Sequence, residues 1–161
     1  MDDKTKKKIK GTGRILFFIY LVLLIFLLFF SERYGRGGTQ EYRYNVVLFA
    51  EIKRFFKYRS LISTESFLLN MFGNVIGFMP FGFFLPMLMR KHSFFRILCL
   101  SFELTLAVEV TQLLFKVGIF DVDDLLLNTI GGVLGYICYR ILRGLLHVCY
   151  KRKRVKIKHV S

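Results

Sequence analysis

The clearest pattern in the chain is a series of long apolar segments separated by short polar ones. Residues 15–30 hold no charged side chain, and a helix over 15–31 with arginines at its ends matches a hydrocarbon core of about 30 Å. Further apolar segments predict spans at about 67–89, 94–115 and 125–147. The pattern therefore predicts an all-α integral membrane protein, a bundle of four transmembrane helices.

The first apolar segment also has the layout of a cleaved signal peptide, because it follows a lysine-rich start. The residues after it, SERYGRGG, contain no cleavage site of the A-x-A type. We therefore expect the segment to be kept as an anchor, and the protein to be a multi-pass protein of the cell membrane.

Positive charge is concentrated at the two ends of the chain. The formal net charge is +14, and much of it lies in residues 1–14 and 149–161, two basic tails that flank a membrane domain at 15–148. Basic residues beside spans follow the positive-inside rule and can contact anionic lipid. We expect the lipid bilayer as a partner, anionic lipid at the tails, and no nucleic acid.

The charges of the connections predict the orientation of the helices. Arg90, Lys91 and Arg96 flank the connection between the second and third spans, whereas the next connection holds Lys116 and three aspartates. Short connections make neighbouring helices antiparallel, so both termini are predicted to be cytoplasmic. Seven basic residues within 33–59 oppose this assignment, because they fall in the predicted outer loop.

Residues 46–64, between the first two spans, mix aromatic and basic side chains. This composition predicts an amphipathic helix that lies in the membrane interface. A solvated loop with some apolar residues fits the same composition, and the sequence does not decide between the two.

Polar side chains within the spans are the candidate ligand-binding residues. A carboxylate near the middle of a membrane helix costs roughly 2.5–3.5 kcal/mol, so it should face protein or water. Helical spacing and the predicted topology bring several such groups to one depth in the outer half of the bundle. They are Asn74, Glu109, Gln112, Asp124 and Asn128, with Asp121 just before the last span. An outward-facing cavity is one interpretation, and packing or helix capping of each residue is the other.

Other residues are expected to be structural. Pro80 cannot donate a backbone hydrogen bond, so it predicts a kink in the second span. Small residues predict close helix contacts, and they are Gly73, Gly77, Gly82, Gly131 and Gly135. Glu103 lies on a different helix face from Glu109, and we expect it to form an ion pair with Arg140 or Arg143.

The same segments resemble a known family. Residues 74–85 (NVIGFMPFGFFL), 109–112 (EVTQ) and 118–135 (GIFDVDDLLLNTIGGVLG) are similar, in order and separation, to signature segments of the VanZ-like family. The resemblance implies a small multi-pass bacterial membrane protein. The founding member is associated with resistance to the glycopeptide teicoplanin, and no catalytic residue is implied.

Two positions depart from the family pattern. Residues 45–52 (NVVLFAEI) resemble an NLxPFxxI segment, but Leu48 stands where proline is usual. Gly118 stands where many members have arginine, three residues before Asp121. The second departure argues against a fixed Arg–Asp pair in this chain.

Three functions fit these observations. The first is protection of the envelope, in which the cavity binds the polar head group of a lipid-linked wall precursor or of a glycopeptide and lowers antibiotic access. The second is an intramembrane enzyme acting on a lipid-linked precursor, with Glu109 as general base and Asp124 as its acid partner. The third is a small transporter or assembly subunit, for which four spans would have to dimerise.

The candidate chemistry includes no nucleophile or metal cluster. No serine or cysteine lies beside the outer carboxylates, and the three histidines map to the predicted cytoplasmic side. Three cysteines without a CxxC spacing predict neither a disulfide framework nor a thiolate zinc site. We therefore expect no metal and no cofactor, and the sequence gives no oligomeric state.

Overall fold

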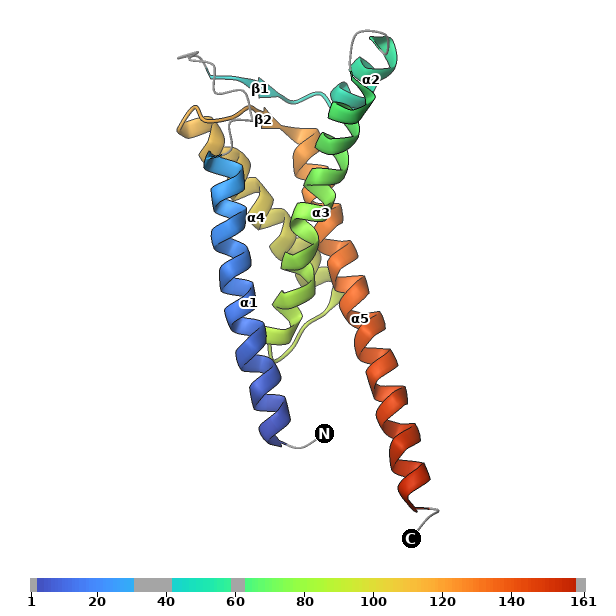
Figure 1. Cartoon of the computed structure of the whole chain (residues 1–161). Coiled ribbons are helices and arrows are strands. Elements are labelled where there is room, and N and C mark those ends of the chain that lie inside the picture. The colour runs from blue at the N-terminus through green and yellow to red at the C-terminus, as the bar shows by residue number, and fades with distance from the viewer. Residues whose placement is uncertain (1–2, 31–41, 59–62, 159–161) are drawn as a thin grey trace.

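The computed structural model describes residues 3–30, 42–58 and 63–158 (Figure 1). Four of the helices in this part of the chain are long and apolar enough to cross a membrane, which confirms the predicted bundle of four helices. In chain order the elements are α1 (Asp3–Phe30), β1 (Tyr44–Asn45), α2 (Ala50–Lys57), α3 (Thr64–Leu88), α4 (Phe94–Leu114), β2 (Phe120–Asp121) and α5 (Val122–Lys158).

The two basic tails are helical and continue α1 and α5. Helix α1 already begins at Asp3, and α5 extends to Lys158. Lysine and arginine are good helix formers, and neither tail contains a proline. The charged ends of α1 and α5 consequently project beyond the connection between α3 and α4 (Figure 1).

The bundle has two different ends. Helix α2 and strands β1 and β2 lie at one end, here called the strand end (Figure 1). The charged ends of α1 and α5 and the α3–α4 connection lie toward the opposite end, here called the terminal end (Figure 1). An even number of antiparallel helices brings both ends of the chain to the same side of the bundle.

Helices α3 and α5 form the most extensive contact in the bundle, and glycines let their backbones meet. A Cβ atom added at Gly82 would overlap the carbonyl oxygen of Gly132, and one at Gly135 would overlap that of Met79. Gly131 lies equally close to the backbone of α3. Such contacts are typical of membrane helices, where close packing replaces the hydrophobic drive for association.

The glycine pair earlier in α3 lies outside this contact. A Cβ atom added at Gly73 or Gly77 would meet no atom within 4 Å. The Gly77 carbonyl instead accepts a hydrogen bond from the Tyr20 hydroxyl of α1, at 2.9 Å. The closest approach of α3 and α5 therefore involves Gly82 and not this pair.

Apolar side chains fill a small core and cover much of the outer surface. The core cluster joins α1, α3 and α4, and it contains Leu24, Leu28, Phe78 and Val108. Many leucine, isoleucine and phenylalanine side chains on the spans are exposed, among them Phe18 and Leu23 on α1. Lipid can cover such a surface at no hydrophobic cost.

The segment after the first span contains a helix and not only a loop. Helix α2 exposes Lys53 and Lys57, and the Phe56 side chain is 68% exposed. Phe55 is only 7% exposed and stacks on Phe67 of α3, with ring centroids 3.9 Å apart. One aromatic side chain therefore holds α2 against α3, while basic and apolar groups remain on its surface.

The helix contact generates a first prediction. Gly135→Ala should lower the thermal unfolding midpoint of the detergent-solubilised protein, because α3 and α5 must separate, and overpacking of this kind costs typically 1–3 kcal/mol. Gly144→Ala is the matched control on α5, since an added Cβ there meets no atom within 4 Å. The control should unfold at or slightly above the wild-type temperature, because alanine favours helix. Equal midpoints for both variants would contradict the close contact.

Candidate functional site

A short parallel strand pair connects the segment before α2 to the connection between α4 and α5. Tyr44 pairs with Phe120, and Asn45 pairs with Asp121. This register places the Asn45 amide beside the Asp121 carboxylate, to which Nδ2 donates hydrogen bonds of 3.2 and 3.1 Å. Segments 76 residues apart are thereby joined at the strand end.

Asp121 is the centre of the polar contacts at this end. Its carboxylate accepts the backbone N–H of Asp123 at 2.7 Å, so it caps the first turn of α5. Its own backbone N–H donates to the Glu109 carboxylate of α4 at 3.0 Å. Because Asp121 is only 7% exposed, these bonds fix the positions of β1, α4 and the start of α5 relative to one another.

Glu109 and Gln112 on α4 form hydrogen bonds with backbone groups. Glu109 is 2% exposed and accepts the Asp121 N–H. Gln112 is also buried, and its Nε2 donates to the carbonyl of Leu28 at 3.1 Å. Leu28 lies in the last turn of α1, where carbonyl groups lack helical partners. Gln112 therefore provides a hydrogen-bond donor for a carbonyl group at the end of α1.

Asp123 binds the residue that precedes α2. Its carboxylate accepts the backbone N–H of Phe49. Phe49 has a φ of 61°, in the left-handed region that side chains such as phenylalanine rarely adopt. The hydrogen bond to Asp123 offsets part of the cost of this conformation. It also holds Phe49 in place where this residue lines a pocket.

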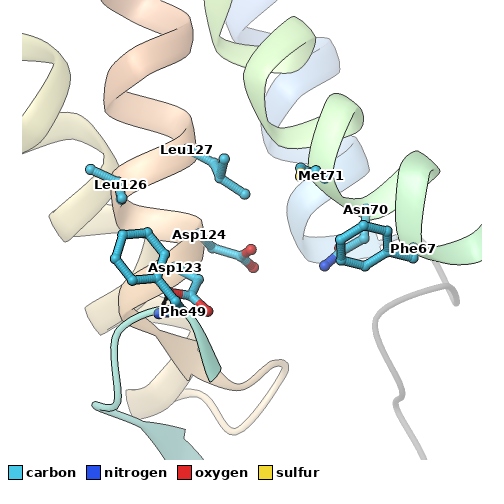
Figure 2. Close-up of a pocket in the computed structure, with 8 residues that line it drawn as sticks. All are labelled: Phe49, Phe67, Asn70, Met71, Asp123, Asp124, Leu126 and Leu127. Atoms are coloured by element: carbon cyan, nitrogen blue, oxygen red, sulfur yellow. Dashed lines mark hydrogen bonds between the residues drawn. The ribbon is translucent and has the colours of Figure 1, made fainter. Parts of the chain in front are cut away.

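The pocket lies between α3, α5 and Phe49, and water-sized groups can occupy a volume of about 30 Å³ in it. In Figure 2 the Asp124 carboxylate extends from α5 toward α3, and Asn70 and Phe67 lie across the pocket from it. Asn74 of α3 donates a hydrogen bond to Asp124 without lining the pocket itself. The lining residues are Phe49, Phe67, Asn70, Met71, Asp123, Asp124, Leu126 and Leu127.

Asn128 belongs to a separate polar contact between α4 and α5. Its Nδ2 donates to the Thr105 hydroxyl at 2.9 Å. Its Oδ1 and the Ser101 hydroxyl are both buried without a hydrogen-bond partner in the structure. Ser101 also lies against Gly132, where an added Cβ atom would overlap its hydroxyl.

The structure thus divides the residues that helical spacing grouped together. Asp124 lines the pocket, and Asn74 binds it. Glu109 and Asp121 connect α4 to the strand end, Gln112 connects α4 to α1, and Asn128 lies between α4 and α5. Apart from Asp124, the residues that line the pocket were not singled out for binding by the sequence, and they are Phe49, Phe67, Asn70, Met71, Asp123, Leu126 and Leu127.

The expected ion pair of Glu103 is not formed. The Glu103 side chain is exposed on α4. Arg140 donates to the Tyr136 hydroxyl, and Arg143 contacts a ring nitrogen of His92. Helical spacing was correct in giving Glu103 a different face from Glu109, but that face does not meet these arginines.

Among the residues that the structure describes, no three His, Cys, Asp or Glu side chains lie close enough together to hold a metal ion. The carboxylates of the strand end instead accept hydrogen bonds from backbone and amide N–H groups.

Comparisons with known proteins agree with the arrangement of the segments. The family model described as VanZ/LLP1 matches residues 17–143, which include most of each of the four spans and every polar residue of the strand end and the pocket described above. The protein VanZ of Enterococcus faecium is 32% identical over 130 residues, which is 81% of this chain and 74% of that protein. The chain belongs to the VanZ family.

The VanZ family is linked to teicoplanin resistance, and this VanZ-family chain is a multi-pass protein of the cell membrane. The family match ends before the charged end of α5 and begins after that of α1, so it covers the bundle and not the basic tails. No solved structure gives a significant match to the chain.

The position of Glu109 generates a second prediction. Glu109→Ala should reduce the thermal stability of the purified protein by about 1–3 kcal/mol, because it leaves the buried Asp121 N–H without an acceptor. Glu109→Gln should retain most of the stability, since an amide oxygen can accept the same bond. Thermal unfolding and the amount of protein in the membrane measure both effects. An equal loss in the two variants would show that the charge of Glu109, and not its acceptor oxygen, stabilises the fold.

Proposed function

We propose that this VanZ-family protein protects the cell envelope by binding a polar head group in the pocket between α3 and α5, and so lowers the access of teicoplanin-type glycopeptides. The observation that carries the proposal is the Asp124 carboxylate, which faces the Asn70 amide across a pocket with otherwise mostly apolar walls (Figure 2). The head group belongs either to a lipid-linked wall precursor or to the glycopeptide itself.

The chemistry of the pocket supports this class of ligand. Carboxylate and amide oxygens accept hydrogen bonds from amine and hydroxyl groups, which sugars and peptides carry. Phe67, Met71 and Leu127 offer apolar surface to an attached chain. A few convergent polar groups in an apolar concave surface are typical of ligand sites.

The remaining polar contacts hold the elements that line the pocket in place. Asp123 holds Phe49 at one wall, and Asn74 holds the Asp124 carboxylate in place. Asp121 and Glu109 fix the start of α5, from which both aspartates project. We therefore interpret Glu109 and Asp121 as positioning residues and Asn70, Asp123 and Asp124 as ligand contacts.

The proposal requires the strand end to face outward. Arg90, Lys91 and Arg96 lie at the terminal end, together with the lysines of α1 and α5. The positive-inside rule assigns such an end to the cytoplasm. The pocket at the strand end then opens toward the side on which wall precursors and glycopeptides meet.

A third prediction tests this orientation. Single cysteines at Val47 and at Lys91, both exposed, are introduced after the three native cysteines are replaced. A membrane-impermeant maleimide should label Val47→Cys in intact cells and Lys91→Cys only after the membrane is permeabilised. Labelling of Lys91→Cys in intact cells would reverse the topology and place the pocket on the cytoplasmic side.

A fourth prediction tests the pocket. Asn70→Leu should abolish most of the teicoplanin protection that the wild-type protein gives to a susceptible bacterium, at unchanged abundance, because it removes an amide from the pocket at similar volume. Thr64→Val is the matched control, since it removes an exposed polar group from α3 outside the pocket. Growth inhibition by teicoplanin and by vancomycin is measured for each strain.

Full protection by Asn70→Leu at normal abundance would exclude the pocket as the site. An equal change for vancomycin would indicate a general envelope effect and not recognition of the lipid-bearing drug. Binding of labelled teicoplanin and of a lipid-linked precursor to the purified protein then separates the two proposed ligands.

A further inference from the structure

A cluster of basic and aromatic side chains lies on the α3–α4 connection and on α5, away from the pocket. The His92 ring packs edge-on against Tyr136 and Tyr139, with centroid distances of 5.7 and 5.5 Å. Arg140 and Arg143 flank this stack and are both exposed, while Tyr136 is only 2% exposed. None of these residues takes part in the function proposed above.

The hydrogen bonds fix the proton positions in this cluster. Arg143 lies 3.2 Å from His92 Nε2, and a guanidinium can only donate, so Nε2 must be the acceptor. His92 is then neutral with its proton on Nδ1, which donates to the Tyr136 hydroxyl at 3.2 Å. Burial, followed by the charges of Arg143 and Arg140, lowers the pKa of His92, in agreement with a neutral ring.

The same hydroxyl also holds the second guanidinium. Arg140 donates to Tyr136 Oη at 3.3 Å and lies over the Tyr136 ring. Within the described part of the chain, both arginines thus bind neutral acceptors, and neither forms an ion pair with a carboxylate. Each guanidinium carries five N–H donors, of which one is used in these bonds. Two positive charges with spare donors are therefore held by an imidazole and a phenol.

The depth of the cluster suits the phosphate layer of a bilayer. His92 lies between the end of α3 at Leu88 and the start of α4 at Phe94, where two spans leave the membrane. Its contacts with Tyr136 and Arg143 bring this part of α5 to the same level. Tyrosine and snorkelling arginine side chains are typical of that level.

We propose that Arg140 and Arg143, held in place by His92 and Tyr136, form a binding site for the phosphate of an anionic phospholipid in the leaflet at the terminal end. The two guanidiniums bind the phosphate oxygens, an acceptor that arginine forks fit well. His92 and Tyr136 are positioning residues that hold the guanidiniums in place. The site is independent of the proposed pocket function, because it uses neither the pocket nor its residues.

The test uses the full-length protein, purified in detergent and titrated with phosphatidylglycerol or phosphatidylcholine while bound lipid is counted by native mass spectrometry. The wild-type protein should retain phosphatidylglycerol preferentially. The double variant Arg140→Gln/Arg143→Gln should lose about tenfold or more in affinity for it, since two charged hydrogen-bond partners are removed. The matched double variant Lys91→Gln/Arg96→Gln removes the same charge from the α3–α4 connection and the start of α4, and it should change the affinity less than twofold.

Two further variants separate the site from a fold defect. Arg143→Lys retains the charge but removes the planar fork, so it should bind phosphatidylglycerol more weakly than the wild-type protein and better than the arginine double variant. His92→Phe retains the ring contacts with Tyr136 and Tyr139 but loses the acceptor for Arg143, and it should also weaken binding. Thermal unfolding in detergent checks that each variant is folded.

Several results would overturn the proposal. Equal losses in the two double variants would mean that net charge alone attracts the lipid. Equal retention of phosphatidylcholine and phosphatidylglycerol by the wild-type protein would exclude recognition of an anionic head group. Displacement of the lipid by inorganic phosphate at equal concentration would assign the site to free phosphate instead.

Discussion

The contact between the backbones of α3 and α5 determines the geometry of the rest of the bundle. Membrane helices gain little from the hydrophobic effect when they associate, so van der Waals contact and hydrogen bonds must hold them together. Gly82, Gly131 and Gly135 allow that contact over about two turns. Toward the strand end larger side chains follow, and the pocket lies there, between Asn70 on one helix and Asp124 on the other. Close packing at one depth thus leaves room at another.

The carboxylates of the strand end show how a membrane protein can keep several acidic groups close together. Asp121 and Asp123 each accept a backbone N–H group, and so does Glu109. Hydrogen bonds from backbone and amide donors stabilise charge without requiring a buried lysine or arginine as a partner. The acidic groups therefore also serve as structural connections, because each one joins two segments that are distant in the chain or caps a helix. These hydrogen bonds offset part of the cost of placing carboxylates near the membrane.

The lengths of the apolar segments were enough to predict the four spans, because each span must by itself be apolar over the thickness of the hydrocarbon core. Polar spacing also singled out Asp124 and Glu109 as candidates, but it could not say which helix each face meets. Asn45 and Phe49 reach the site only through a strand pair of two residues, which has no periodicity to detect. The expected pair between Glu103 and Arg140 or Arg143 was wrong for the same reason: a helical wheel gives a direction on one helix and not the neighbour in that direction. Asn70 lies one turn before Asn74, and helical spacing alone did not single it out as a pocket residue.

The attachment of α1 shows how a helix can be held without dependence on many of its side chains. Tyr20 donates to the carbonyl of Gly77, and Gln112 donates to the carbonyl of Leu28. In both bonds the acceptor is the main chain, which every amino acid provides. The axial position of α1 is therefore set by the bonds of one tyrosine and one glutamine together with the packing of Leu24 and Leu28 in the core, whereas its lipid-facing positions are restricted only to apolar residues. A helix of different apolar sequence on its lipid-facing side could replace α1 in a chimaera and keep the same register, provided that the tyrosine keeps its hydrogen bond to the Gly77 carbonyl.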